Sequence, residues 1–186
     1  MIKNSVSDRN WILSKFDENK VKKVTQELGL SEVLCRLLAI RNVEADQSLD
    51  FLNPKIKNSM PNPFLLKSMD EAVKLIIKHI KEESQICIYG DYDVDGASST
   101  SILARFLRNF TSNFFIFIPD RIQDGYGPNL KIFEDIASRG VKLIITVDCG
   151  TTSFEPIEYA KSKNIDVVVI DHHQSTETLP KANAIV

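Results

Sequence analysis

The stretch ICIYGDYDVDGASSTSILARFLRNF, residues 86–110, passes from one type of secondary structure to another within a few residues. Its first five residues form a short apolar run rich in β-branched and aromatic side chains, which is typical of a buried strand. Three aspartates follow, Asp91, Asp93 and Asp95, and Gly96 ends the series. Apolar residues then recur at helical spacing to the end of the stretch. A strand, an acidic turn and a helix in this order predict part of an open α/β sheet, in which ligands bind where strands end.

The same aspartate spacing opens an EF-hand calcium loop, which has carboxylates at positions 1, 3 and 5 and glycine at position 6. An EF-hand closes with a bidentate glutamate at position 12, but that position, counted from Asp91, is Ile102. An EF-hand loop also lies between two helices, whereas this one follows a strand. The sequence therefore argues against a calcium loop.

From residue 85 onward, strand-like runs alternate with helical ones. The expected strands are ICIYG, FFIFIPD, VKLIITVDCG, DVVVIDHH and ANAIV, and the expected helices cover 97–109, 129–140 and 154–164. This alternation predicts βαβ units. The fold class is therefore α/β, with a largely parallel sheet of about five strands flanked by helices.

The amino-terminal part looks different, because VKKVTQELGL and SEVLCRLLAIRNV carry apolar residues at helical spacing and no strand pattern. Ser31 is expected to cap the second of these helices. The proline- and asparagine-rich NPKIKNSMPNPF breaks the pattern. We therefore expect a small helical region over 1–66 and an α/β domain over 67–186.

The α/β domain is expected to open with a helix before its first strand. Ser68 and Glu71 match a capping box, and the helix is expected to continue to about Glu82. His79 lies on this helix, next to Ile80 and among lysines, and is interpreted as a partly exposed packing residue.

Composition sets broad limits on the class of protein. A hydrophobic share of 43% and a charged share of 26% are ordinary for a globular protein. Apolar runs of membrane-span length and a signal-peptide core are both missing, so we expect a cytoplasmic protein without a membrane partner. Cys35, Cys87 and Cys149 match no zinc spacing and suggest a reducing compartment, with the last two as small buried strand residues. The net charge of −2 offers no broad basic footprint for nucleic acid, although divalent ions can supply positive charge locally.

Acidic and imidazole side chains stand at the carboxyl ends of the later strands as well. Asp120 follows the second strand, Asp148 the third, and Asp171, His172 and His173 the fourth. Because the ends of parallel strands share one edge of a sheet, we expect four loops to deliver these groups to one crevice. Asp120 is the weakest member, since Pro119 before it and Arg121 after it also suit an ordinary turn residue that is paired locally.

Several crowded carboxylates repel one another and generally need cations. Oxygen and imidazole ligands suit Mn²⁺, Mg²⁺ or Zn²⁺ better than Ca²⁺. Ligands from several loops favour two ions ~3.5–4 Å apart, a pair that activates water for phosphodiester hydrolysis without a serine or cysteine nucleophile.

Each group also has a purely structural interpretation: Asp91 satisfies a turn, Asp148 caps the next helix, and His173 orients a neighbour. These structural roles together would require charged groups to stand at three consecutive strand ends by coincidence, so they explain the pattern poorly. The phosphate-binding motifs GxxxxGK[ST] and GxGxxG and the GxSxG elbow are absent from the sequence, which removes support for nucleotide-triphosphatase, dinucleotide-binding and serine-hydrolase functions.

Four motifs in the order YGDYDVDG, IPDRIQDGYGPN, ITVDCGT and VIDHHQ resemble the DHH phosphoesterase superfamily, and within it the RecJ family of single-strand-specific 5′→3′ DNA exonucleases. The amino-terminal part is similar too, through Trp11, LCRLLAIRN, DFLNP and MPNPFLLKSMDEAV. The resemblance therefore covers essentially the whole chain.

The resemblance implies a nuclease of DNA repair and recombination that uses two divalent ions, Mn²⁺ or Mg²⁺. The implied metal ligands are Asp91, Asp93, Asp95, Asp148 and His172, with Asp148 bridging both ions. The implied catalytic residues are Asp93, Asp95, Asp148, His172 and His173, with Asp171 in support. The implied substrate-binding residues are Arg121, Gly125, Tyr126 and Gly127, although the glycines also suit turn geometry alone.

RecJ proteins continue beyond ANAIV with a further aspartate ligand and more domains, so the resemblance implies a DHH domain truncated at its carboxyl end. The implied partners are single-stranded DNA and a helicase or single-strand-binding protein; the oligomeric state, the preferred metal and the division of labour among the first three aspartates stay open. Two alternatives are a DHH phosphodiesterase of short oligoribonucleotides or cyclic dinucleotides, and a non-catalytic scaffold or inactive fragment.

Overall fold

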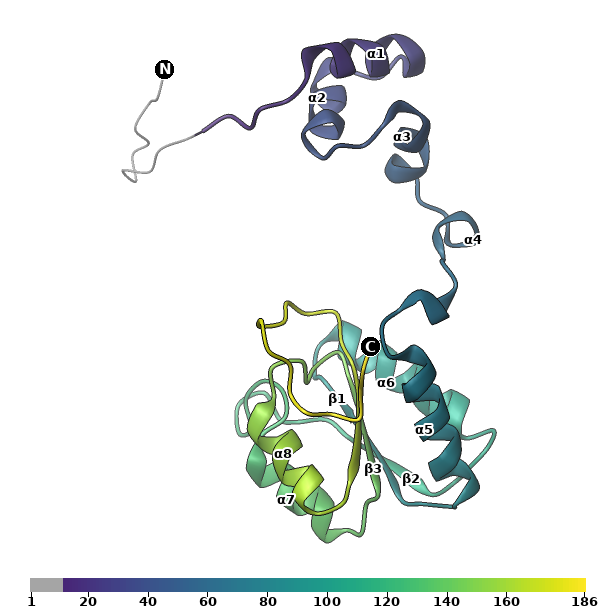
Figure 1. The fold of residues 1–186 in the computed structure, drawn as a ribbon, viewed down its shortest axis with the longest axis vertical. Helices are drawn as coiled ribbons and strands as arrows, with labels where there is room; N and C mark the ends of the chain where they lie inside the picture. The colour runs from purple at the N-terminus through teal and green to yellow at the C-terminus, as the bar shows by residue number, and fades with distance from the viewer. Residues whose placement is uncertain (1–11) are drawn as a thin grey trace. The chain divides into compact units, whose positions relative to one another are not determined.

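Figure 1 shows the computed structural model of the chain, which describes residues 12–186; Trp11 lies outside the described residues. The chain divides into two compact units, Met1–Pro61 and Asn62–Val186. The described part of the first unit contains helices α1 (Glu18–Leu28), α2 (Glu32–Ile40), α3 (Ala45–Leu52) and α4 (Ile56–Ser59). This unit has a small core of its own, formed by Val21, Val24, Cys35, Leu38, Ala39 and Val43.

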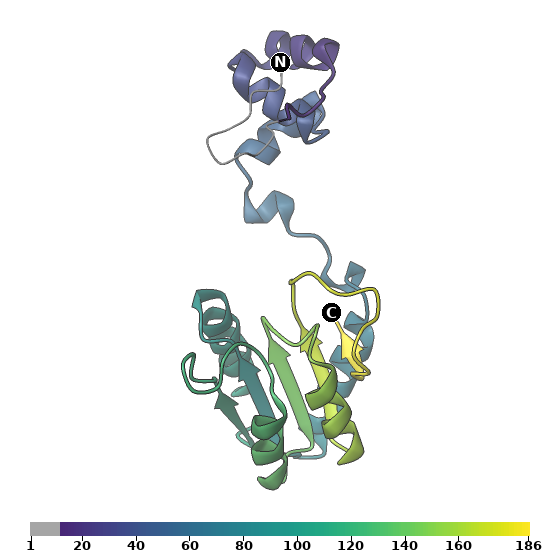
Figure 2. The ribbon, with the colours of Figure 1, turned by 90° about the vertical axis from the view of Figure 1, so that its left-hand side faces the viewer.

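The second unit contains a five-stranded sheet in which every pair of neighbouring strands is parallel, as predicted. Its strands are β1 (Ile86–Gly90), β2 (Phe114–Phe117), β3 (Leu143–Val147), β4 (Asp166–Ile170) and β5 (Ala184–Ile185). The spatial order is β2-β1-β3-β4-β5 (Figure 2). β1 and β3 are buried along their whole length, which explains their continuous apolar sequences.

Helices cover both faces of this sheet (Figure 1). α5 (Met69–Lys81) and α6 (Val94–Leu107) pack on one face, and α7 (Leu130–Ser138) and α8 (Phe154–Ser162) pack on the other. Side chains alternate along β1, so Ile88 joins the α5/α6 core while Tyr89 joins the α7/α8 core. A short 3₁₀ helix, Pro63–Leu65, precedes α5.

Two predicted helix starts differ from the structure. Ser68 occupies the N-cap position of α5 with φ +55° and makes no side-chain capping bond, so the predicted capping box is wrong. An N-cap side chain reaches the first turn from extended backbone, and the left-handed conformation of Ser68 removes that geometry. α6 begins at Val94, three residues earlier than expected, because Asp93 caps it through Gly96 N–H. Ser31 stands at the N-cap of α2 as predicted, but without a side-chain capping bond.

His79 differs most from its prediction, because it is buried and not partly exposed. Its Nε2 lies 2.9 Å from Oδ2 of Asp166, at the start of β4, and Asn183 Nδ2 donates to the other oxygen of that carboxylate at 2.8 Å. Lys78 Nζ also lies 3.8 Å from Asp166 Oδ2, and the helical period places His79 on the face of α5 that carries buried Ala72. The His79–Asp166 pair therefore fastens α5 to the sheet.

Cys87 and Cys149 are free and buried, as predicted, although Cys149 lies just after β3 and not within it. Over residues 12–186, each helix is too short or too polar to cross a membrane.

Candidate metal centre

The order of the strands creates a crevice at the carboxyl ends of β1 and β3. β1 lies between β2 and β3, and the chain leaves β1 toward α6 on one face but leaves β3 toward α8 on the other. Ligands of doubly wound sheets bind at such a reversal of strand order. Asp91 and Asp93 follow β1 at this point and Asp148 follows β3, so the topology brings the first and third acidic loops together.

The turn after β1 is closely packed. Asp91 is 1% exposed, and its Oδ1 accepts a hydrogen bond from Tyr92 N–H at 2.8 Å. Asp93 Oδ1 accepts from Gly96 N–H at 2.9 Å, and this bond holds the pKa of Asp93 below its usual value. A Cβ at position 96 would overlap the backbone of Asp91, so only glycine lets the start of α6 lie this close to the first aspartate.

Asp148 lies at the centre of the site in an unusual conformation. Its φ is +63°, and its N–H donates to the carbonyl of Ile170 at 2.9 Å. Its Oδ1 lies 3.0 Å from His172 Nε2, while its Oδ2 is buried and has no hydrogen-bond partner among the described residues. Burial raises the pKa of Asp148, and the charge of Asp93 raises it further. A buried carboxylate with a spare oxygen is well suited to bind a cation.

The loop after β4 is held in place by Asp171. Its side chain is 2% exposed and accepts hydrogen bonds from Thr151 N–H at 3.0 Å and from His173 N–H at 3.1 Å. His173 Nδ1 also lies 2.8 Å from the same carboxylate. Although burial alone would raise the pKa of Asp171, the bonds from Thr151 and His173 lower it to about 2. Asp171 thus orients the loop, and the exposed ring of His172 reaches Asp148.

Two groups of side chains offer ligand atoms that lie within 4.8 Å of one another. One group is Asp91, Asp93 and Asp148, and the other is Asp148, His172 and His173. Asp148 belongs to both groups, so a single carboxylate stands between two potential ion positions. Carboxylate oxygens together with imidazole nitrogens suit Mn²⁺, Mg²⁺ or Zn²⁺.

Two of the aspartates predicted to lie in the crevice, Asp95 and Asp120, belong to neither ligand group. Asp95 is exposed on the first turn of α6, where it lines a second hollow together with Asp148 and His172, so its role as a ligand stays a prediction. Asp120 accepts hydrogen bonds from Ile122 N–H and Gln123 N–H within its own turn. Three loops, and not four, therefore supply the ligand groups over the described residues.

The GYG segment lies beside these groups. Tyr126 Oη is 3.3 Å from both ring nitrogens of His173. Burial, and then the charge of Asp171, raises the pKa of Tyr126, so its hydroxyl stays protonated. The ring of Tyr92 meets that of Tyr126 edge-on at 6.5 Å, and Arg121 Cζ lies 5.6 Å from the Tyr92 ring centroid. Tyr126 thus contacts the site directly, whereas Arg121 is joined to it through Tyr92, a residue that was not predicted to take part.

The two glycines of this segment have left-handed backbone, with φ +79° at Gly125 and +73° at Gly127. Tyr89, on β1, donates its buried hydroxyl to the Gly127 carbonyl at 2.8 Å. The turn interpretation of the glycines therefore has direct support. Their predicted contact with substrate stays a prediction.

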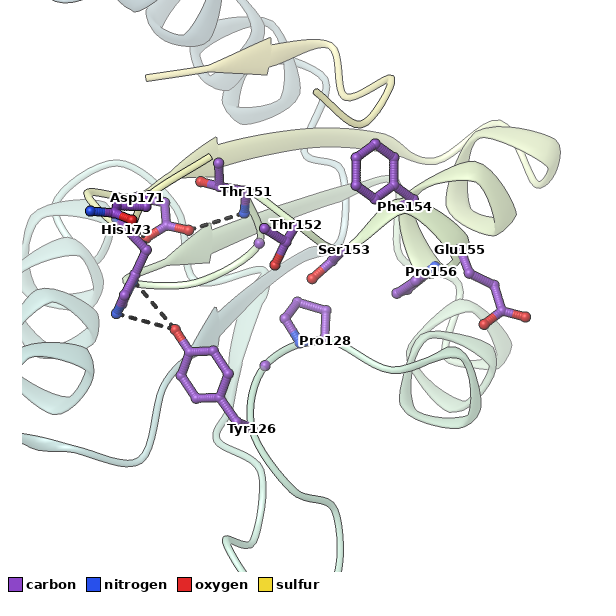
Figure 3. A pocket seen from close by; sticks show the side chains of 13 residues that line it. Tyr126, Pro128, Thr151, Thr152, Ser153, Phe154, Glu155, Pro156, Asp171 and His173 are labelled. Atoms are coloured by element: carbon purple, nitrogen blue, oxygen red, sulfur yellow. Dashed lines mark hydrogen bonds and ion pairs between the residues drawn. The ribbon is translucent and has the colours of Figure 1, made fainter. Parts of the chain in front are cut away.

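The loop between β3 and α8 also lies beside the site, although its residues were not predicted to belong to it. Thr151 in this loop donates its N–H to Asp171, and the next residues line a hollow beside His173 (Figure 3). Two adjacent threonines followed by a serine before a helix were the available signal.

Comparison with known proteins gives a consistent result. Residues 85–186 match the DHH family, N-terminal domain. The single-stranded-DNA-specific exonuclease RecJ of Bacillus subtilis (strain 168) is 38% identical over 181 residues, which are 97% of this chain and 23% of that protein. RecJ of Escherichia coli (strain K12) is 36% identical over 158 residues, 84% of this chain and 27% of that protein. The chain spans about a quarter of the length of these curated relatives.

Solved structures agree in fold. A crystal structure of RecJ in complex with Mn²⁺ from Thermus thermophilus matches with a TM-score of 0.65 and 25% identity, over 92% of this chain and 24% of that one. Another structure, of exonuclease RecJ bound to manganese, matches with a TM-score of 0.60 and 32% identity, over 64% of this chain and 31% of that one. The predicted kinship is confirmed, and the chain belongs to the DHH family.

Proposed function

We propose that this protein hydrolyses phosphodiester bonds in single-stranded DNA from the 5′ end, with two Mn²⁺ or Mg²⁺ ions, in cytoplasmic DNA repair and recombination. The observation that carries the proposal is Asp148, whose buried carboxylate belongs to both ligand groups and keeps one oxygen without a partner among the described residues. The names of the relatives and the manganese in the two solved structures support the same activity.

The residues present fit such a pair of ions. Asp91 and Asp93 would hold one ion together with Asp148, and His172 and His173 would complete the second position with that same aspartate. When bound, the ions would supply a reactive water and neutralise charge on the phosphate oxygens. The ions would also offset the repulsion between these aspartates.

The surrounding residues prepare the centre for this task. The hydrogen bond from Gly96 N–H keeps Asp93 ionised, because it stabilises the charged carboxylate. His173 Nδ1 lies 2.8 Å from the Asp171 carboxylate, which favours the neutral ring with its proton on Nδ1 and leaves Nε2 available as a ligand.

Contacts to the single-stranded DNA would come from the side of the site where the GYG segment, residues 125–127, lies. Tyr126 is 55% exposed and Tyr92 stands edge-on to it, so aromatic faces are available for bases to stack on, as single-strand-binding proteins use. Arg121 adds a positive charge beside Tyr92 and can contact the phosphate backbone. A helicase or a single-strand-binding protein would be the partner that presents the single-stranded DNA.

Two measurements test the proposal. Calorimetry should detect Mn²⁺ binding to the purified chain, and gels should show loss of nucleotides from 5′-ended single strands but not from duplex. The double variant Asp148→Asn with His172→Ala should lose both properties, while Asp120→Asn should keep both. Cleavage that survives the double variant would refute the mechanism.

The same assays separate the alternatives. Preferred turnover of dinucleotides or cyclic dinucleotides over long single strands would favour a phosphodiesterase of short substrates. Mn²⁺ binding without cleavage of any of these substrates would favour a scaffold or an inactive fragment.

A further inference from the structure

A hollow of about 710 Å³ opens directly beside the metal centre (Figure 3). Tyr126 and Pro128 form one wall, Thr152 and Ser153 form the facing wall, and His173 stands at the end nearest the metal ligands. Its volume is in the range of pockets that hold small organic ligands. The hollow is therefore large enough for a nucleoside, and it shares His173 with the second group of proposed metal ligands.

The chemistry of the walls favours an uncharged ligand. Lysine and arginine do not occur among the described residues that line this hollow, whereas Glu155 and Asp171 do. Two carboxylates, with only the imidazole of His173 beside them, disfavour an anion such as free phosphate. The rings of Tyr126 and Pro128 offer a flat apolar face of the kind on which bases stack.

The opposite wall offers free hydrogen-bonding groups. The hydroxyls of Thr152 and Ser153 form no hydrogen bond within residues 12–186, and Ser153 makes no capping bond although it precedes α8. Thr152 is exposed and Ser153 half-buried, and Figure 3 shows both side chains pointing toward the Tyr126–Pro128 wall. A hydroxyl donates or accepts, so these groups can meet the edges of different bases.

We propose that this hollow binds the sugar and base of the nucleotide whose phosphate lies at the metal centre. The proposal rests on the proposed function for the position of the phosphate. Thr151 links the two places, because its N–H holds Asp171 in the DHH loop while the next two residues line the hollow. The base would thus be held at a fixed distance from the scissile phosphate, which is how binding contributes to positioning.

Binding of a nucleoside to the metal-free chain tests the site without depending on catalysis. Amide NMR spectra of the full 186-residue chain with chelator would be recorded during titration with deoxyadenosine and, separately, with inorganic phosphate. Deoxyadenosine should shift the amides of Thr152 and Ser153, and phosphate should not. No shift with deoxyadenosine, shifts confined to other residues, or shifts with phosphate alone would overturn the proposal.

A blocking variant locates the ligand. Thr152→Trp should fill the hollow and raise the Kd of deoxyadenosine at least about tenfold, which corresponds to about 1.4 kcal/mol. Thr178→Trp, an exposed threonine outside the hollow, should leave the Kd unchanged. If Thr152→Trp does not fold, Glu155→Trp on the exposed first turn of α8 replaces it. An unchanged Kd in a folded blocking variant would overturn the proposal.

Cleavage assays distinguish an error in the proposed nucleoside site from an error in the proposed nuclease function. With Mn²⁺, an abasic 5′-terminal nucleotide should raise KM at least about fivefold over a normal one, because a stacked base contributes ~1–3 kcal/mol. A chain that cleaves no DNA but shows the expected shifts refutes the proposed function and leaves the nucleoside site standing. A chain that cleaves normal and abasic ends equally and shows no shifts refutes the site alone.

Discussion

Replacing Asp148 with asparagine tests the central carboxylate by removing its charge while keeping its shape. The backbone at this position has φ +63°, a left-handed conformation that asparagine adopts more readily than most residues. Asp148→Asn is therefore expected to fold without backbone strain, so its effects report on the charge.

In the absence of metal, the variant should be more stable than the wild type. Burial and the neighbouring Asp93 raise the pKa of Asp148, so the native protein holds this proton more tightly than the unfolded chain does. The ionised group therefore costs stability as pH rises above the ordinary value of 3.8. A buried polar group without a partner costs about 1–3 kcal/mol, and Oδ2 is such a group among the described residues. Asparagine still buries a polar atom but no charge, so we expect a gain of about 1 kcal/mol at pH 7.

With Mn²⁺ the order should reverse. A ligand at a hundred times its Kd stabilises the native state by about 2.7 kcal/mol. The wild type should gain this amount, whereas Asp148→Asn loses the carboxylate shared by both ligand groups and should gain little. The variant should then be less stable than the wild type by about 1–2 kcal/mol. This is the stabilisation by bound Mn²⁺ that the variant lacks, minus the stability that it gains by losing the buried charge.

Urea denaturation at pH 7, with chelator and with excess Mn²⁺, measures both differences. A further pair of curves with chelator near pH 4 should show the two proteins converging, because Asp148 is then increasingly protonated in both states. Asp120→Asn is the matched control, since its carboxylate lies outside both groups and this variant should keep the full Mn²⁺ stabilisation. A variant that is less stable than the wild type with chelator, or that gains as much from Mn²⁺, would refute the reasoning.

Three other substitutions test the frame of the site. Gly96→Ala should lower the free energy of unfolding by about 1–3 kcal/mol, because its Cβ overlaps the backbone of Asp91; an unchanged urea midpoint would contradict the close packing. His79→Ala should cost about 2–5 kcal/mol, since it leaves a cavity and strips Asp166 of a partner, yet calorimetric Mn²⁺ affinity should not change. Asp171→Asn should destabilise the metal-free protein by about 2 kcal/mol at pH 7, because the native pKa lies near 2, below the unfolded value. Since that stability is present above about pH 4 and lost as pH falls toward 2, a destabilisation independent of pH would show that charge is not its cause.

The strands could be predicted because burial on both faces imposes a continuous apolar sequence. LIITV of β3 is buried at every residue, and such a run between two helical patterns has few other structures open to it. The parallel direction of β1 to β4 followed from the helices between these strands. The spatial order of the strands could not be predicted, because the apolar sequence of β1 is compatible with any of the other strands as a neighbour on either side. That β3 lies next to β1 is a property of the folded sheet.

Residues whose role depends on local conformation were predicted less well. Ser68 has the residue type of a cap but the backbone of a left-handed turn, and sequence spacing does not distinguish the two. His79 was misplaced because its partner, Asp166, is 87 positions away in the chain. The left-handed backbone of Asp148 was equally invisible to a pattern of residue types.

The acidic residues show why position at a strand end predicts a site only in part. A strand end places a carboxylate at the correct edge of the sheet, but backbone donors nearby decide what the carboxylate does there. Asp120 uses Oδ1 for two N–H groups of its own turn, and nothing among the described residues brings it toward the crevice. Asp93 caps α6 in a similar way and still belongs to a ligand group, because its loop leaves β1 beside β3. The strand order therefore selects the candidate metal centre from among the acidic turns, and a carboxylate oxygen without a donor among the described residues, as at Asp148 Oδ2, marks where the cation is expected.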